Sequence, residues 1–235
     1  DVYKRQPHEP YNIDQTAWYE GQETWEPNTK RYASLITHMD AAIGRLLNEL
    51  EQLNLRKNTL IIFASDNGAA IQAPIKILNC NAGFKGRKGT LYEGGIRVPF
   101  IVNQPGMVPI QTLDNLIYFP DMMPTLAALA KGTKHLPKQI NGINILPLFY
   151  GKQVDTDNRL LYWEFPGKQR AARKGDWKCV TIHPNQPLEL YNLKEDPEET
   201  NNLAKKYPRR VKEFDEEMQR MHIPTPNWPQ PGEQF

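Results

Sequence analysis

This sequence has few cysteines, little net charge and no long apolar run. Its 235 residues contain two cysteines, Cys80 and Cys179, which fix neither a disulfide framework nor a metal site. The two thiols could form one disulfide or remain two small buried side chains. Lys and Arg number 29 and Asp and Glu 27; because the two signs are interspersed, we expect no nucleic-acid partner. No apolar run approaches the roughly 20 residues that cross a bilayer, so we expect no membrane span.

The start of the chain lacks the features of a protein's beginning. Asp1 stands where an initiator Met would be, and no signal peptide follows it. We therefore expect these residues to be a fragment. The length still allows a real hydrophobic core and either one large or two small domains. Hydrophobic residues make up 39% and charged residues 24% of the chain, as in an ordinary globular protein.

The first part of the chain has the pattern of an α/β layer. From Arg31 to Asn54 or Asn58, apolar residues recur at the i, i+3, i+4, i+7 spacing of a helix with one buried face. They are Tyr32, Leu35, Ile36, Met39, Ile43, Leu46, Leu47 and Leu50. Residues 59–64 form a short continuous apolar run, typical of a parallel strand covered on both faces, and 98–102 predict the next strand. A helix followed by such a strand favours the α/β class.

The pattern changes after residue 151. Before it, Asp121 is expected to cap a helix that ends at Gly132. After it, short runs separated by turn residues predict antiparallel strands. They are 160–165, 171–181 with a turn at 174–176, and 188–193. An amphipathic helix follows over 209–221. We therefore expect an α/β domain over 1–150 and a small α+β subdomain over 151–235.

Asp66 and Asn67 come directly after the apolar run 59–64. Ligands of open α/β sheets bind beyond the carboxyl ends of strands, and a carboxylate beside an amide oxygen suits Ca²⁺ or Mg²⁺. On this dipeptide alone, a plain turn is the better explanation, since Asp, Asn and Gly dominate turns. The motif downstream, over residues 86–99, reverses that preference.

Lys88 lies among glycines in an irregular connection over residues 69–91. An ammonium group in such a loop can approach an anionic ester and neutralise charge that builds up on it. The alternative is a solvated surface lysine. Glu93 and Arg97 follow, and we expect them to pair and brace the loop. An oxygen-rich metal site followed by a cation suits the handling of a tetrahedral oxyanion ester.

His8, within Pro7-His8-Glu9-Pro10, is the third candidate. A histidine can donate a proton to a leaving oxygen near neutral pH, although a histidine so close to the start is more often a surface residue. His38 lies on the predicted helix and is expected to be structural. The other three histidines have no motif around them.

Ten segments in series resemble the sulfatase family of the alkaline-phosphatase superfamily. They are Pro7 to Pro10, Tyr32 to Gly44, Asn58 to Gly68, Gly86 to Pro99, Asp121 to Thr125, Tyr162 to Glu164, Arg173 to Lys178, Glu189 to Leu193, Asp196 to Glu199 and Asn202 to Ala204. Each segment alone is a weak or moderate signal, but together they cover nearly the whole chain in the family's order.

The resemblance implies a fold, an activity and roles for four residues. The fold is an alkaline-phosphatase-like central mixed sheet flanked by helices, incomplete here, plus a small C-terminal antiparallel sheet with a packed helix. The activity is calcium-dependent hydrolysis of a sulfate ester, possibly on a carbohydrate. Asp66 and Asn67 match the second half of the calcium site, Lys88 matches the lysine that contacts the sulfate, and His8 matches the histidine near the leaving oxygen.

The chain departs from the family pattern at the nucleophile. The family's formylglycine arises from Cys or Ser in a Cys/Ser-x-Pro-x-Arg motif, and neither Cys80, before Asn81, nor Cys179, before Val180, fits it. The resemblance therefore places the formylglycine in a missing N-terminal part. We expect the 235 residues alone to be inactive and poorly soluble.

Two other functions fit the same residues. One is a phosphodiesterase or phosphonate monoester hydrolase of the same superfamily; the other is a non-catalytic relative that kept the fold for binding. The family resemblance implies a sulfated small molecule or glycan as partner and a periplasmic or secreted location. It leaves the oligomeric state open.

Overall fold

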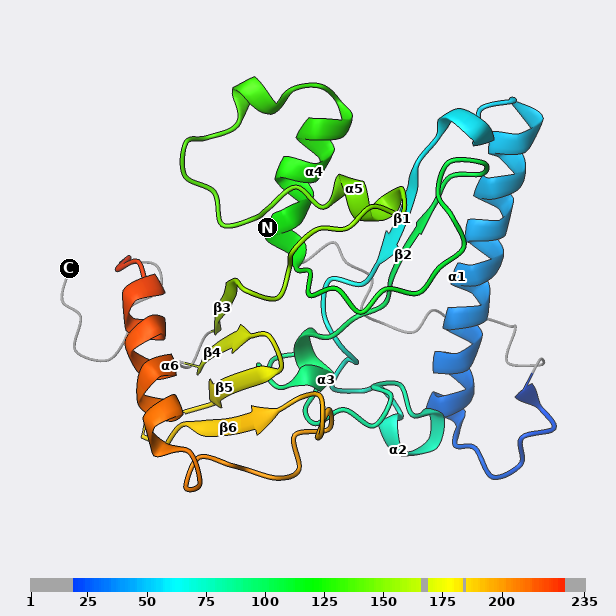
Figure 1. Cartoon of the computed structure of the whole chain (residues 1–235). Helices are drawn as coiled ribbons and strands as arrows, with labels where there is room; N and C mark the ends of the chain where they lie inside the picture. Colours follow the sequence, from blue (N-terminus) through cyan, green and yellow to red (C-terminus); the bar gives the residue numbers. More distant parts are fainter. Residues whose placement is uncertain (1–18, 166–168, 184, 227–235) are drawn as a thin grey trace.

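The computed structural model describes residues 19–165, 169–183 and 185–226. Within them, a long helix and a pair of strands form one part, and a four-stranded sheet with a helix forms another (Figure 1). The α/β class is therefore as predicted. No helix in these ranges is long and apolar enough to cross a membrane.

The strand pair of the first part consists of β1 (Ile61–Ala64) and β2 (Phe100–Asn103). Both predicted strands are thus present. They pair antiparallel, with Ile61 opposite Asn103, and β1 is half-buried along its length. The prediction of a parallel strand is wrong for the pairing that β1 makes within the described residues. A continuous apolar run reports burial, and it carries no information on strand direction.

The long helix α1 (Pro27–Gln52) leaves part of its apolar face exposed. A proline occupies the first turn, where its missing N–H costs nothing, and Asn54 follows the end at φ +56°, as helix-ending residues often do. Ile36, Met39 and Leu46 are 45, 41 and 58% exposed. The helix is confirmed, but the expected burial is wrong for these three residues, while the other apolar residues of the face are half-buried.

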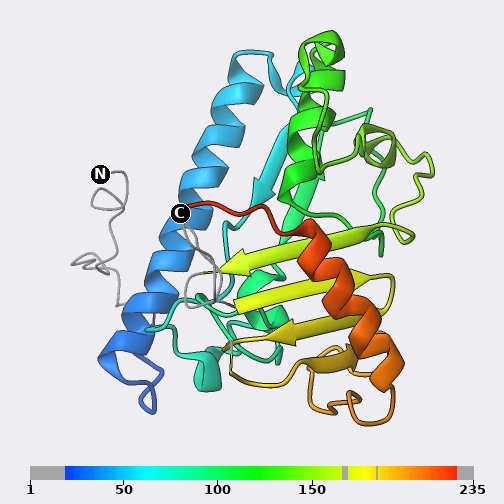
Figure 2. The ribbon, with the colours of Figure 1, turned by 90° about the vertical axis from the view of Figure 1, so that its left-hand side faces the viewer.

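Short helical segments connect the longer elements. They are η3 (Arg56–Asn58), α2 (Ile75–Leu78), α3 (Glu93–Ile96), η4 (Phe119–Asp121), α4 (Met122–Leu129), η5 (Thr133–His135) and α5 (Leu146–Phe149). Ile145, Leu148 and Phe149 are buried and pack with apolar side chains of β1 and β2. The strand pair lies between α1 and α4 (Figure 2).

Asp121 is fully buried at the start of α4, but it does not cap that helix. Its carboxylate accepts N–H bonds from Tyr118 (3.0 Å) and Ile143 (2.9 Å). It also receives both terminal nitrogens of Arg159, one of them at 2.6 Å. The predicted cap is therefore wrong. Asp121 instead closes the preceding turn η4 and joins α4 to the segment before the C-terminal sheet.

The variant Asp121→Asn should lower the free energy of unfolding by about 2 kcal/mol. An asparagine keeps the size of the side chain but removes the charge that faces Arg159, which is largely buried. Chemical denaturation of the full-length gene product measures the loss. Asp114→Asn, at an exposed aspartate of the same segment, is the matched control. Equal stability of the two variants would contradict the assigned role of the ion pair.

The second part is a fully antiparallel sheet in the order β3-β4-β5-β6. Its strands are β3 (Leu160–Phe165), β4 (Gln169–Lys174), β5 (Trp177–Thr181) and β6 (Glu189–Asn192). The predicted turn between β4 and β5 is confirmed, with Gly175 at φ +54°, a conformation that glycine adopts at little cost. The helix α6 (Pro208–Met221) follows.

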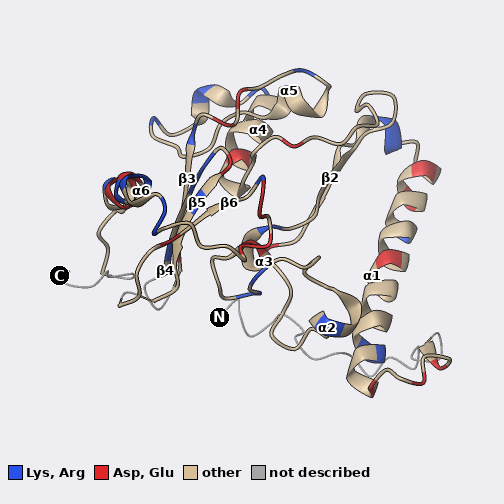
Figure 3. Ribbon diagram, turned by 60° about the horizontal axis from the view of Figure 1, so that its bottom comes forward, with Lys and Arg blue, Asp and Glu red and all other residues tan. Residues whose placement is uncertain are grey.

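The two faces of this sheet have different partners. On one face, Phe214 and Met218 of α6 pack on Cys179 and its buried neighbours, as the predicted apolar side of the helix requires. The outer side of α6 carries acidic and basic residues together (Figure 3). On the opposite face, Leu91 and Tyr92 pack on buried residues of the sheet. The connection that carries Lys88 therefore rests directly on the C-terminal strands.

Candidate functional site

Asp66 and Asn67 form a turn directly after β1, with Asp66 exposed and Asn67 half-buried. Ser65 Oγ donates to the Asn67 carbonyl at 2.8 Å, which closes the turn. The Asn67 amide nitrogen donates to Asp66 Oδ1 at 3.0 Å and to the Gly68 carbonyl at 3.4 Å. Because the nitrogen faces these two oxygens, the amide oxygen is the atom left for a ligand. The turn thus presents a carboxylate and an amide oxygen at the carboxyl end of a strand.

The turn at Asp66 and the segment around Lys88 are held together by their backbones. Gly68 N–H donates to the Gly95 carbonyl, and Lys88 N–H donates to the Ala69 carbonyl, each at 2.9 Å. The approach leaves no room for a side chain, since a Cβ added to Gly68 would lie 1.8 Å from the Gly94 oxygen. Position 68 therefore requires glycine. The two backbone hydrogen bonds fix Lys88 relative to Asp66.

One cavity of 1520 Å³ is lined by Asp66, Asn67 and Lys88 together. The same cavity extends to the C-terminal sheet, where Trp163 and Arg173 contribute to its wall. The structure thus brings three of the four predicted site residues to one cavity. The fourth, His8, lies outside the described residues.

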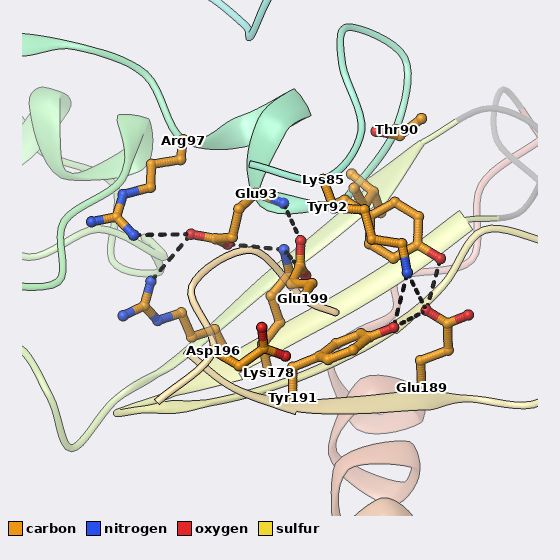
Figure 4. Close-up of polar contacts among 12 residues, drawn as sticks. Lys85, Thr90, Tyr92, Glu93, Arg97, Lys178, Glu189, Tyr191, Asp196 and Glu199 are labelled. Atoms are coloured by element: carbon orange, nitrogen blue, oxygen red, sulfur yellow. Dashed lines mark hydrogen bonds and ion pairs between the residues drawn. The ribbon is translucent and has the colours of Figure 1, made fainter. Parts of the chain in front are cut away.

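A buried ion cluster fixes the C-terminal end of the loop that carries Lys88, which runs over residues 85–93. Glu93, 2% exposed, receives Lys178 Nζ at 2.9 Å. The same nitrogen lies 2.9 Å from Glu199, whose other oxygen accepts the Glu93 N–H at 2.6 Å (Figure 4). Burial raises the pKa of Glu199, and the Lys178 charge opposes that rise. Three chain segments thus meet at one buried lysine.

Two arginines complete the cluster at the cavity side. Arg97 lies 3.7 Å and Arg173 3.6 Å from the second oxygen of Glu93. Burial lowers the pKa of Arg173, although the Glu93 charge opposes this. The expected pairing of Glu93 with Arg97 is confirmed. The roles of Lys178 and Glu199 were not predicted; the available signal was a lysine within the otherwise uncharged strand β5.

A second cluster anchors the start of the loop. Lys85 Nζ lies 3.4 Å from Glu189 Oε2 and donates to Tyr191 Oη at 3.0 Å. The Tyr92 and Tyr191 hydroxyls donate to the same carboxylate at 2.7 and 2.6 Å (Figure 4). Burial disfavours ionisation of Glu189, yet these hydrogen bonds and the Lys85 charge hold its pKa below the ordinary value. The loop is therefore tied to the sheet at both ends.

Neither cysteine has the properties of a nucleophile. Both thiols are free, so the disulfide that the sequence left open is not formed. Cys179 is fully buried, and burial raises its pKa to about 12. Burial also raises the pKa of Cys80, with an opposing hydrogen bond from Tyr32. Thiols with raised pKa values hold little reactive thiolate near neutral pH.

The Asp66 turn can supply only part of a metal site. These ranges contain no group of three or more His, Cys, Asp and Glu side chains placed to hold a metal ion. Asp66 and Asn67 supply two oxygen donors, whereas Ca²⁺ takes six to eight. The chemistry of this donor set suits calcium, but as part of a larger site.

Two family models match the chain and overlap at the loop. The model described as "Sulfatase" matches residues 3–133. The model described as "N-sulphoglucosamine sulphohydrolase, C-terminal" matches residues 84–223. Both therefore include the segment that carries Lys88 and Glu93.

Curated relatives and a solved structure extend the match. A "Sulfatase" of Formosa agariphila is 31% identical, over 83% of this chain and 39% of its own length. An "N-acetylgalactosamine-6-O-sulfatase" of Bacteroides thetaiotaomicron is 30% identical, over 77% of this chain and 40% of its own. The crystal structure of Ps i-CgsB in complex with k-i-k-neocarrahexaose has 26% identity and a TM-score of 0.81, covering 96% of this chain and 50% of that one. The chain thus spans about two fifths of these curated relatives, and the alkaline-phosphatase-like fold is confirmed.

Proposed function

Because this chain belongs to the sulfatase family, we propose that it carries part of the active site of a calcium-dependent sulfuric ester hydrolase. One observation supports this more than any other: Asp66, Asn67 and Lys88 line the same cavity, and two backbone hydrogen bonds fix their relative positions. An anionic ester there would meet cationic and oxygen-ligand chemistry from one rigid unit.

Each residue has a defined task in the proposed reaction. Asp66 and Asn67 hold part of a calcium site through their side-chain oxygens; when bound, calcium supplies positive charge to the ester's oxygens. Lys88 contacts the sulfate group and stabilises the negative charge that grows on it during cleavage. His8 donates a proton to the leaving oxygen, a role that rests on the family resemblance alone.

The nucleophile is proposed to lie outside these 235 residues. The chain contains no Cys/Ser-x-Pro-x-Arg sequence that could give the family's formylglycine, and Cys179 is buried in the core of the sheet. The expectation that the chain is a fragment, inactive alone, therefore remains part of the proposal. Absence of activity in the isolated chain, with activity in the full-length gene product, would support it.

We extend the proposal to a sulfated glycan as substrate. Tyr118, Phe119 and Trp163 contribute to the cavity wall, and aromatic rings of this kind can pack against sugar rings. Two of the proteins compared above carry names or ligands from glycan chemistry. Hydrolysis of sulfated monosaccharides and oligosaccharides, measured against 4-nitrophenyl sulfate, tests the substrate class. Faster turnover of the nitrophenyl ester than of every sugar would contradict it.

The domain division and the location are also proposals. The division into 1–150 and 151–235 accords with the separate strand pair and four-stranded sheet, and limited proteolysis near residue 151 tests it. The periplasmic or secreted location rests on the family resemblance, and fractionation of cells that express the full-length gene product tests it.

The variant Lys88→Ala should reduce sulfate-ester hydrolysis by the full-length gene product about a hundredfold or more, the scale of losing one transition-state contact. Release of sulfate measures kcat and KM, with a phosphate ester assayed in parallel. Lys57→Ala removes an exposed lysine on η3 and serves as the control. A loss of activity below about threefold would show that Lys88 makes no important contact with the sulfate. Faster cleavage of the phosphate ester would instead favour phosphoester chemistry.

A further inference from the structure

Gln169, the first residue of β4, reaches across to the loop that carries Lys88. Its side-chain nitrogen donates to the Gly89 carbonyl at 2.9 Å, and its side-chain oxygen accepts the Leu91 N–H at 3.3 Å. One amide group therefore spans Thr90 and ties the main chain on both sides of it. Gln169 is 9% exposed, so these bonds lie largely out of water.

The backbone around Lys88 is thereby held on both sides. On one side, the Lys88 N–H bonds to the Ala69 carbonyl. On the other, Gln169 holds the carbonyl of the very next residue, Gly89. Gly89 itself has φ +90°. Few residues other than glycine adopt this left-handed conformation. Lys88 thus sits between two anchors that come from different parts of the chain.

An amide side chain is well suited to make both bonds at once. Asn and Gln carry a donor and an acceptor on one group, and Gln has the longer reach. Leu91 is 4% exposed, so loss of the acceptor would leave a buried N–H without a partner, which is costly. The segment would relieve that cost by moving, and Lys88 would move with it.

We propose that Gln169 is a positioning residue for Lys88, which places the ammonium group against the sulfate ester by fixing the main chain at Gly89 and Leu91. This inference rests on the proposed function, because it assigns Gln169 a part in the same reaction. Gln169 itself does not line the cavity, so it acts through the loop and not on the substrate.

The variant Gln169→Met tests the proposal. Methionine has a similar volume, so the change removes both hydrogen bonds while keeping the packing. In the full-length gene product we expect kcat for a sulfate ester to fall roughly tenfold with a smaller change in KM, because a misplaced group loses transition-state contacts first. Gln104→Met is the matched control, since Gln104 also uses its amide in two hydrogen bonds, to Lys57 and Tyr150.

A double-mutant cycle with Lys88→Ala separates positioning from general stability. If Gln169 acts through Lys88, the change to methionine should have less than a twofold effect on kcat once Lys88 is absent. A tenfold further loss in that background, or no loss in the single variant, would overturn the proposal. Absence of any effect of Lys88→Ala on an active enzyme would instead refute the role of Lys88.

Amide hydrogen exchange gives a readout that does not depend on activity. Residues 86–92 should exchange at least about fivefold faster in Gln169→Met, because local opening controls exchange, whereas residues 177–181 should be unchanged. Unchanged exchange over 86–92 overturns the proposal even if no sulfate ester is cleaved. Faster exchange without any sulfatase activity would support the anchoring of Lys88 while refuting the proposed function.

Discussion

Hydrolysis of sulfate esters by the full-length gene product should be abolished by Asp66→Ala. The change removes one of two adjacent oxygen donors at the end of β1, and Asn67 alone offers a neutral amide oxygen. A calcium site loses affinity steeply when a charged ligand is removed, so excess calcium should restore activity only in part. Sulfate release, measured across a calcium titration after chelation, gives the result.

Asp40→Ala is the control for this experiment, because Asp40 is an exposed carboxylate on α1, away from the cavity. Its activity and calcium dependence should match those of the parent. A second readout is the melting temperature, which calcium should raise in the parent and in Asp40→Ala more than in Asp66→Ala, since a bound ligand stabilises the native state. Unchanged turnover by Asp66→Ala at low calcium would show that Asp66 is not a calcium ligand.

Replacement of Lys178 by methionine should destabilise the protein by about 3–5 kcal/mol, the usual cost of removing one partner of a buried ion pair. Lys178 is fully buried between Glu93 and Glu199. Without it, two carboxylates face each other in the interior, and only Glu93 keeps other cationic partners. For a chain of this size we expect the melting temperature to fall by roughly 10 °C.

A compensating change gives the matched test. The double variant Lys178→Met with Glu199→Gln removes the unpaired charge, and it should recover more than half of the lost stability. Glu199→Gln retains an oxygen for the Glu93 N–H. Lys212→Met, at an exposed lysine of α6, should leave the melting temperature unchanged. Failure of the double variant to recover any stability would contradict the role of the buried charge.

The stability of the single variant Lys178→Met should depend on pH. The pKa of Glu199 is raised in the folded protein, so folded Glu199 keeps a proton more readily than unfolded Glu199. Its ionisation therefore lowers stability as pH rises from the unfolded pKa through the folded one. Lys178→Met removes the positive charge that lowers the pKa of Glu199. The loss of folding stability caused by this variant should therefore be larger at pH 8 than at pH 5. A deficit that grows toward acidic pH would contradict the assignment.

Local patterns were sufficient to predict the longer elements and to single out Asp66 and Lys88 as candidates for one site. The helix at α1, the hairpin turn at Gly175 and the apolar side of α6 all follow from periodicity and turn chemistry, which depend on neighbours in the sequence. The motif around Lys88 indicated an anionic-ester site, and the structure brings that residue to the same cavity as Asp66.

The features that were missed depend on contacts between distant residues. Asp121 looked like a helix cap, because its position before a helix is local information, whereas its partner Arg159 is 38 residues away. Ile36 and Met39 have helical spacing, but their exposure depends on what packs against the helix. Lys178 looked like one position in a strand; its two acidic partners lie in other segments. Periodicity cannot report any of these.

The attachment of the Lys88 loop to the C-terminal strands has a consequence for synthesis on the ribosome. Glu93 and Glu199, which meet through a backbone hydrogen bond, are 106 residues apart in the chain. At about 5–20 residues per second, roughly 5–20 s pass between their emergence. For most of that interval the loop has neither Gln169 nor Lys178 to hold it, and Glu199 is the last of the three to be made. The loop that carries Lys88 can therefore take its final conformation only when translation has nearly reached α6.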